Sequence, residues 1–190
     1  MTSAPALSTH ARVVAAAAEL TLEVGWAGVT MGKLADRVGV SRQTVYNEVG
    51  SKPQLAEEMV LAELMTFLAV VDAAFDAHPD DLVEAIRSAS RGVLELAERN
   101  ALLQAVVSAS YGAETELLPL LTTHSDALVL TTNEAVRARV AAYRIDLDAD
   151  RLDAAIDMVV RLVLSHVVHP GGTPAATADG IAWISERTLR

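Results

Sequence analysis

Apolar residues recur at three- and four-residue spacing along almost the whole chain, and no segment shows a convincing alternation of apolar and polar positions. This spacing places apolar side chains on one face of an α-helix, so it predicts an all-α fold. Ser8 or Thr9 can cap the first helix, and Gly25 is expected to end it. Its apolar stripe consists of Val13, Val14, Ala17, Leu20 and Val24.

Two short helices joined by a three-residue turn are predicted next. Thr30 can cap the first of them, which runs through Val38, and Ser41 can cap the second, which runs through Val49. A glycine stops each helix. A long helix is predicted from Ser51 to about His78, with the apolar stripe Leu55, Met59, Ala62 and Met65. Further helices are predicted from Asp81 to Arg99 and from Leu102 to Ser110, and between Glu114 and Tyr143 with a break near Pro119. The last two are predicted from Asp148 or Asp150 to Val168 and from Ala175 to Leu189.

Residues 31–50 have the layout of a helix-turn-helix. Ala35 is small where the two helices must approach, and Gly39 can adopt the left-handed conformation that the turn requires. Val45 is expected to face a small core formed with Leu34, Val38 and Val49. At 100° per residue, the opposite side of the second helix is then centred on Asn47.

The residues on and beside that outer side suit contacts with DNA. Asn and Gln can form bidentate hydrogen bonds with adenine, Arg favours guanine, and the Thr methyl group can touch a thymine methyl group. Helix N-termini favour phosphate oxygens. The predicted DNA-binding residues are Thr30, Arg42, Gln43, Thr44, Tyr46, Asn47 and Lys52.

Glu48 falls outside the centre of this outer side, toward the first short helix. A salt bridge with Lys33 or Arg37 is the expected role of its carboxylate. The alternative is that it accepts a hydrogen bond from a cytosine amino group.

Charge confines any DNA contact to the N-terminal quarter of the chain. The formal net charge of the 190 residues is -10, but residues 1–52 carry five basic and four acidic side chains, and the other residues carry 10 basic and 21 acidic ones. An acidic body repels a polyanion.

The absence of cysteine excludes disulfides and thiolate metal sites. The chain also lacks a signal-peptide pattern and an apolar run long enough to span a bilayer. Together these features predict a cytoplasmic protein with no membrane role.

The segment VTMGKLADRVGVSRQTVYNEVGSKPQLAEEMV resembles the N-terminal domain of the TetR family of bacterial transcriptional regulators, and the close match covers about residues 9–65. The motif commonly seen as Tyr-x-His-Phe is here Tyr46, Asn47, Glu48, Val49. The resemblance implies a homodimer, operator binding through the third helix, and a small molecule that enters the C-terminal domain and alters DNA binding. Within the family, the chain further resembles members that control hydrocarbon or fatty-acid metabolism. The expected domains are residues 1–50, a three-helix DNA-binding domain, and residues 51–190, a larger helical domain for effector binding and dimerisation.

The predicted effector pocket lies among the middle helices, where few charges interrupt the apolar residues, so a largely apolar effector is expected. Tyr111, His124 and His166 are candidate polar anchors within it. The full predicted set is Phe67, Val71, Leu103, Val106, Val107, Tyr111, Leu121, His124, Leu128, Met158, Leu162 and His166.

The last two helices are apolar on more than one face, as buried helices are. The family resemblance implies that they pair with their copies in a dimer interface, and the alternative is an intramolecular core. The predicted interface residues are Leu152, Ile156, Val159, Val163, Val167, Ile181, Trp183 and Ile184.

Neither a metal site nor a catalytic site is expected. His166 and His169 lie three residues apart, but no nearby carboxylate spacing completes a metal site. His124, Ser125 and Asp126 point in different directions on a helix and cannot form a relay, and no phosphate-binding or dinucleotide-binding motif is present. The sequence therefore predicts a dimeric one-component regulator without a cofactor, most simply a repressor that binds a palindromic operator. The alternatives are a DNA-binding dimer without small-molecule input and a helical lipid-binding protein.

Overall fold

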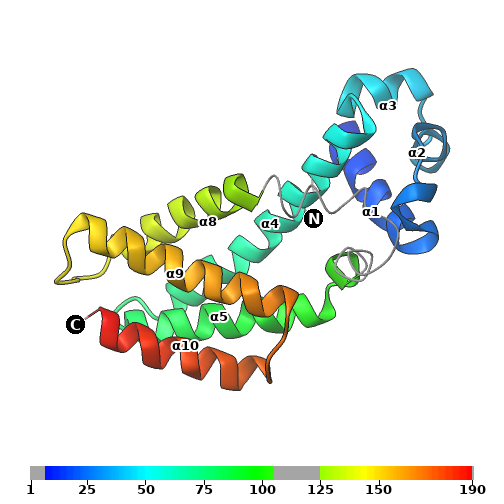
Figure 1. The fold of residues 1–190 in the computed structure, drawn as a ribbon. Helices are drawn as coiled ribbons and strands as arrows, with labels where there is room; N and C mark the ends of the chain where they lie inside the picture. The colour runs from blue at the N-terminus through cyan, green and yellow to red at the C-terminus, as the bar shows by residue number, and fades with distance from the viewer. Residues whose placement is uncertain (1–6, 105–124, 190) are drawn as a thin grey trace, which may run out of the picture. The chain divides into compact units, whose positions relative to one another are not determined.

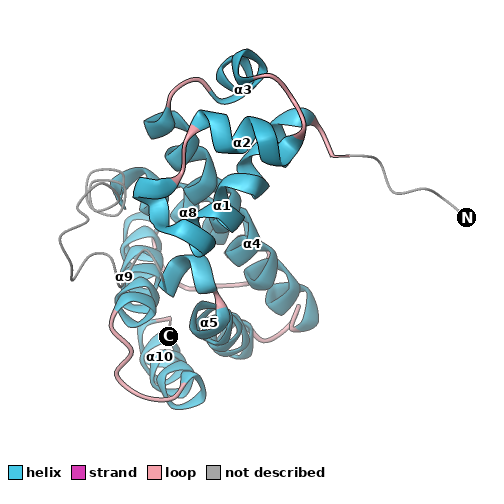
Figure 2. Ribbon diagram, turned by 90° about the vertical axis from the view of Figure 1, so that its right-hand side faces the viewer, coloured by secondary structure: helices cyan, strands magenta, loops and turns pink. Residues whose placement is uncertain are grey.

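A computed structural model describes residues 7–104 and 125–189, which are helices joined by loops (Figures 1 and 2). No strand occurs among these residues. The helices are α1 (Thr9–Gly28), α2 (Met31–Val38), α3 (Arg42–Val49), α4 (Lys52–Ala77), α5 (Leu82–Arg99), α8 (Ser125–Val140), α9 (Ala149–Val168) and α10 (Pro174–Thr188). The predicted all-α fold is confirmed. Most of the predicted helix at Leu102–Ser110 and the piece around Pro119 lie outside the described residues.

Side-chain caps fix the helix starts where the sequence predicted them. The Ser8 hydroxyl accepts a hydrogen bond from the Ala11 amide at 3.1 Å. The Asp81 carboxylate accepts one from the Glu84 amide at 3.0 Å. Asp148, one of two candidates, caps α9. Each cap satisfies an amide that the helix itself leaves without a partner.

Helix α1 differs from its predicted course at its end. Gly25 has φ 71° and ψ 161°, so the regular helix stops there as predicted, but a further turn carries α1 to Gly28. The prediction that Val24 lies on the buried stripe is wrong, because 47% of Val24 is exposed. Trp26, in the turn that follows Gly25, is buried instead.

The chain forms two compact units. The first contains the described residues 7–63 and 101–104. Its core combines residues of α1, α2, α3 and α4 with Leu102, and its most deeply buried side chains include Val13, Leu34, Val45 and Leu55. The predicted stripe of α4 holds only at its start, because Ala62 and Met65 are exposed.

The second unit contains residues 64–100 and 125–189. Within it α5 packs against α9 and α10, and α8 packs against α9. Phe75 and Tyr143 meet edge to face with ring centroids 5.9 Å apart. The Tyr143 hydroxyl donates a hydrogen bond to the His78 carbonyl oxygen at 2.8 Å, which ties the loop after α8 to the end of α4.

Candidate nucleic-acid interface

The turn between α2 and α3 has the geometry that the sequence predicted for a helix-turn-helix. Gly39 ends α2 in the left-handed conformation, with φ 77° and ψ 40°, and its amide donates to the Ala35 carbonyl oxygen at 2.9 Å. Ser41 begins α3, because its hydroxyl oxygen accepts from the Thr44 amide at 3.0 Å. A glycine adopts a left-handed conformation without the steric cost of a Cβ, so the chain can reverse in three residues.

One side of α3 is anchored in the core of the first unit. Val45 and Val49 are buried against Leu34, Ala35 and Val38 of α2. Because buried residues four positions apart lie on the same helical face, they fix the rotation of α3 about its own axis. The opposite side of α3 therefore faces outward.

That outward side, which we call the recognition face, presents the amides of Gln43 and Asn47. Both residues are exposed, and the Gln43 Nε2 donates to the Asn47 Oδ1 at 3.0 Å. The bond holds both amides on the same outward ridge. Each amide retains donors and an acceptor for a base edge. Thr44, at the edge of this face, is half-buried, and its hydroxyl lies 2.8 Å from the Ser41 hydroxyl.

Arg42 and Tyr46 flank the recognition face. The Arg42 guanidinium carbon lies 5.8 Å from the centroid of the Tyr46 ring. This distance is at the limit of a cation–π contact, which orders the guanidinium without neutralising its charge. Both side chains are exposed.

Thr30 and Lys52 both lie at helix starts. The Thr30 hydroxyl caps α2 by accepting from the Lys33 amide at 3.2 Å. Lys52 is the first residue of α4, and its Nζ lies 4.9 Å from the centroid of the Trp26 ring. Both positions combine a helix N-terminus with a polar or cationic side chain, an arrangement that favours phosphate.

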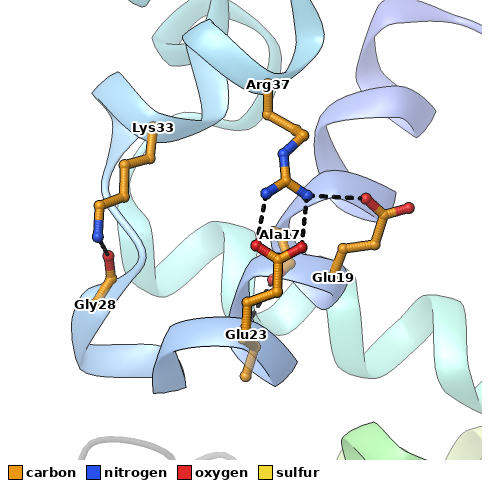
Figure 3. A network of polar contacts seen from close by, with 7 residues as sticks. Ala17, Glu19, Glu23, Gly28, Lys33 and Arg37 are labelled. Carbon is orange, nitrogen blue, oxygen red and sulfur yellow. Dashed lines mark hydrogen bonds and ion pairs between the residues drawn. The ribbon is translucent and has the colours of Figure 1, made fainter.

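The basic residues of α2, Lys33 and Arg37, are bound by residues of α1 (Figure 3). The Arg37 guanidinium donates to both carboxylate oxygens of Glu23, at 3.0 and 2.6 Å, and to Glu19 at 3.3 Å. The Lys33 Nζ donates to the Gly28 carbonyl oxygen at 2.8 Å. Hydrogen bonding with Arg37 lowers the pKa of Glu23, and the same bond raises the pKa of Arg37. The ion pairs secure α2 to α1.

The predicted salt bridge of Glu48 is wrong, because both expected partners, Lys33 and Arg37, bind residues of α1. Arg37 binds Glu19 and Glu23, and Lys33 binds the Gly28 carbonyl. Instead, the backbone carbonyl of Glu48 contacts the ring of His10 at 3.0 Å. Helical periodicity does not predict a contact between residues 38 positions apart in the chain.

The second unit contains an apolar hollow of about 680 Å³ bounded by α5, α8, α9 and α10. Two residues predicted for the effector site, Met158 and Leu162, line it. So do five predicted for the dimer interface, which are Leu152, Ile156, Val159, Ile181 and Ile184. The hollow is also lined by Ile86 and Val136, which were not among the predicted residues although both belong to helices with apolar periodicity.

The other predicted residues of the C-terminal region do not line this hollow. Phe67, Val71, Leu103, Leu128 and Val163 are half-buried, and Val167 is buried. The His166 Nδ1 lies 2.9 Å from the Leu162 carbonyl oxygen of its own helix. Trp183 is 57% exposed, with the Arg187 guanidinium 4.0 Å from its ring centroid. Val106, Val107, Tyr111, Leu121 and His124 lie outside the described residues.

Comparison with known families gives two matches that together span most of the chain. Residues 13–59 match the model of bacterial regulatory proteins of the tetR family, and residues 81–187 match the C-terminal domain of the bacterial tetracyclin repressor. The second match alone covers more than half of the chain. The chain belongs to the TetR family.

Individual members of the TetR family are similar over most of their length. The HTH-type transcriptional regulator AlkX of Mycobacterium tuberculosis is 31% identical over 163 residues, covering 83% of this chain and 74% of that protein. The crystal structure of the TetR family repressor AlkX from Dietzia sp. strain DQ12-45-1b, implicated in biodegradation of n-alkanes, has a TM-score of 0.75 and 25% identity, with 95% of each chain covered. A Mesorhizobium loti structure with 14% identity and a TM-score of 0.63 shares the fold.

TetR-family membership makes the protein a transcriptional regulator and supports DNA binding by its helix-turn-helix. TetR-family regulators are transcription factors. Within residues 7–104 and 125–189, no group of three or more His, Cys, Asp or Glu side chains is placed to hold a metal ion. In the same part of the chain, no helix has both the length and the apolar character of a membrane span.

Proposed function

We propose that this TetR-family protein is a one-component repressor that binds a palindromic operator as a homodimer. Residues 1–50 form the DNA-binding domain, and residues 51–190 bind the effector and dimerise. The observation that carries the proposal is the orientation of α3: its Val45 and Val49 side is locked in the core while the Gln43 and Asn47 amides face outward. A rigid helix with an exposed polar ridge suits the major groove.

The side chains around α3 divide into base contacts and phosphate contacts. Gln43 and Asn47 contact base edges, and the Thr44 methyl group adds an apolar contact with thymine. Arg42 and Tyr46 flank them and reach bases or phosphates. Thr30 and Lys52 contact phosphates at the N-termini of their helices, which fixes the register of the protein on the duplex.

A second copy of the chain supplies the second recognition helix, because one short helix contacts only a few base pairs. Twofold-related helices about 34 to 36 Å apart meet successive major grooves. Three apolar residues of α9 and α10 are left substantially exposed: Met158 (69%), Trp183 (57%) and Ile184 (45%). With the hollow beside them they form an apolar patch of the kind that marks a protein interface. We assign this patch to the dimer.

The effector is a small, largely apolar molecule, and binding it weakens the hold on the operator. Two observations support this assignment: the apolar character of the second unit, and the likeness to AlkX proteins, one of which is implicated in the biodegradation of n-alkanes. An n-alkane or a fatty acid derived from it is the effector class that these observations favour. Helix α4 contributes residues to both units, so it connects effector binding with DNA binding. A coupling of about 1 to 3 kcal/mol is typical of such systems.

The test is a gel shift with the full-length protein and a duplex from the intergenic region next to its gene. Replacing Gln43, Tyr46 and Asn47 together by alanine should abolish specific binding and leave the dimer and its helical circular dichroism intact. Specific binding by this variant would overturn the assignment of the site. A graded series of n-alkanes and fatty acids should release wild-type protein from the duplex; constant affinity across the series would favour a regulator without small-molecule input.

A further inference from the structure

His10 contacts two other helices through the two nitrogens of one ring. Its Nδ1 lies 3.0 Å from the carbonyl oxygen of Glu48 in the last turn of α3. Its Nε2 lies 3.5 Å from the Oε2 of Glu58 on α4. His10 itself belongs to the first turn of α1, and all three residues lie in the first unit. One side chain therefore bridges α1, the recognition helix and α4.

The chemistry of the two partners determines where the ring needs its protons. A carbonyl oxygen only accepts hydrogen bonds, so the Nδ1 facing Glu48 must carry a hydrogen. A neutral imidazole has a single N–H, and its Nε2 then presents a lone pair to the Glu58 carboxylate, which is also an acceptor. A proton on Nε2 turns this repulsion into an ion pair. The neutral ring can thus satisfy Glu48 alone, whereas the imidazolium satisfies both partners.

The Glu58 carboxylate lacks another way to satisfy the oxygen that faces the ring. Its Oε2 is buried and has no hydrogen-bond partner among the described residues, apart from the facing His10 nitrogen. Leaving a buried carboxylate oxygen without a donor is costly. A hydrogen on the His10 Nε2 would therefore supply the donor that the Glu58 Oε2 lacks.

The surrounding charges act in both directions on a positive His10. Glu58 on α4 and the C-terminal end of α3, where the carbonyl groups point outward, favour the cation. The N-terminal end of α1 disfavours it. Arg12, two residues further along α1, is directed to the Val38 carbonyl oxygen of α2, and Glu48 contributes its own carboxylate on α3. The ion pair with Glu58 is the contact that the charged His10 ring makes and the neutral ring does not.

We propose that His10 is a positioning residue that ties the end of the recognition helix to α4, and that a proton on its Nε2 completes the tie. The proposal rests on the proposed function, in which α3 binds the operator. Holding the end of α3 before DNA arrives lowers the ordering cost of binding. Because a rising pH removes that proton, operator affinity should fall as the pH rises.

The experiment measures operator affinity of the full-length dimer from pH 5.5 to pH 8 at constant salt, with a duplex enriched from a random-sequence pool. Because the His10 and Glu58 side chains are 43% and 33% exposed, the effect is modest. We expect wild-type affinity to fall by about threefold to tenfold across this range, as befits two partly exposed ion pairs per dimer. His78→Gln, which alters a histidine of the second unit, should give the wild-type profile.

Glu58→Gln separates the positioning role from a merely structural one. The glutamine amide can donate to the lone pair of a neutral His10 Nε2. This variant should therefore bind the operator as tightly at pH 8 as at pH 5.5, without the pH dependence of the wild type. His10→Phe removes both contacts and should bind more weakly at pH 5.5, also without the pH dependence. A wild-type pH profile in either variant would overturn the proposal.

A measurement without DNA distinguishes failure of this proposal from failure of the proposed function. The ¹⁵N chemical shifts of the His10 ring report which nitrogen carries the hydrogen. We expect the neutral ring to carry it on Nδ1, and to gain the Nε2 hydrogen when the pH falls. A neutral ring with its hydrogen on Nε2 would overturn the tie whatever the DNA result. If the ring behaves as expected but no duplex is preferred, the proposed function fails instead.

Discussion

Arg37 of α2 and Glu23 of α1 form a two-bond ion pair, with Nη1 3.0 Å from one carboxylate oxygen and Nη2 2.6 Å from the other. Glu19 adds a third contact to the same guanidinium at 3.3 Å. The pair joins the first helix of the helix-turn-helix to the helix beneath it. It also neutralises a cation that would otherwise be available to phosphates, so we expect Arg42 and Lys52 rather than Arg37 to make the phosphate contacts of the proposed interface.

The Arg37–Glu23 pair should make stability depend on pH at the acidic end. The pKa of Glu23 is lowered in the folded protein, chiefly by its hydrogen bond with Arg37. A carboxylate whose pKa is lower in the folded protein than in the unfolded chain stabilises the fold at pH values above the unfolded pKa. That contribution to stability disappears as the pH falls through the folded pKa. Thermal melts should therefore show Glu23→Gln slightly less stable than wild type at pH 7, with the difference vanishing towards pH 3. The change is small because both side chains are partly exposed to solvent. An equal difference at both pH values would contradict this cause.

The salt dependence of operator binding should distinguish Arg42 from Arg37. Each phosphate contact adds about 0.9 to the slope of log affinity against log salt concentration. Arg42→Ala should reduce the slope by about 2 per dimer, since one contact is lost in each protomer. Arg37→Ala serves as the matched control and should leave the slope unchanged, because its guanidinium is bound to Glu23 and Glu19. A reduced slope for Arg37→Ala would place that residue on the phosphates.

The core of the first unit should respond strongly to truncation of Leu34. This side chain is 0% exposed and lies between α2 and its neighbours. Leu34→Ala should lower the free energy of unfolding by about 2 to 5 kcal/mol, through lost apolar burial and the cavity left behind. Leu22→Ala is the control, because Leu22 is 49% exposed and should change the free energy by less than about 0.5 kcal/mol. Urea unfolding followed by circular dichroism measures both. Similar losses in the two variants would contradict this placement of the core.

The exposed apolar residues of α9 and α10 should control the oligomeric state. Met158→Glu combined with Ile184→Glu puts four carboxylates into the proposed interface of each dimer. Burying unpaired charge is costly, so sedimentation should show a monomer. Leu22→Glu, an exposed position on α1, should leave the dimer intact. A double variant that remains dimeric would move the interface elsewhere.

The sequence predicted the elements whose causes are local. Caps at Ser8, Ser41 and Asp81 and the left-handed Gly39 depend on residues within one turn, and the structure contains all of them. The burial of Val45 followed from its spacing within a single helix.

What the sequence could not predict depends on how helices meet. Glu48 was paired with the wrong partners because Arg37 turns toward α1, a direction that helical periodicity does not specify. Val24 fits the apolar spacing of α1 but is exposed, and Trp26, after the break at Gly25, is buried instead. Likewise, periodicity marked α9 and α10 as apolar without showing that the predicted effector and dimer residues line one hollow.

Recognition of bases by the Gln43–Asn47 face of α3 is tested most directly by competition between a selected duplex and random duplex. Wild-type protein should prefer the selected duplex by about a thousandfold or more at physiological salt. Asn47→Ala should reduce this preference by about 1 to 3 kcal/mol in free energy per contact and leave binding to random duplex unchanged. An undiminished preference in Asn47→Ala and in Gln43→Ala, or no preference in the wild type, would contradict recognition of bases by this face.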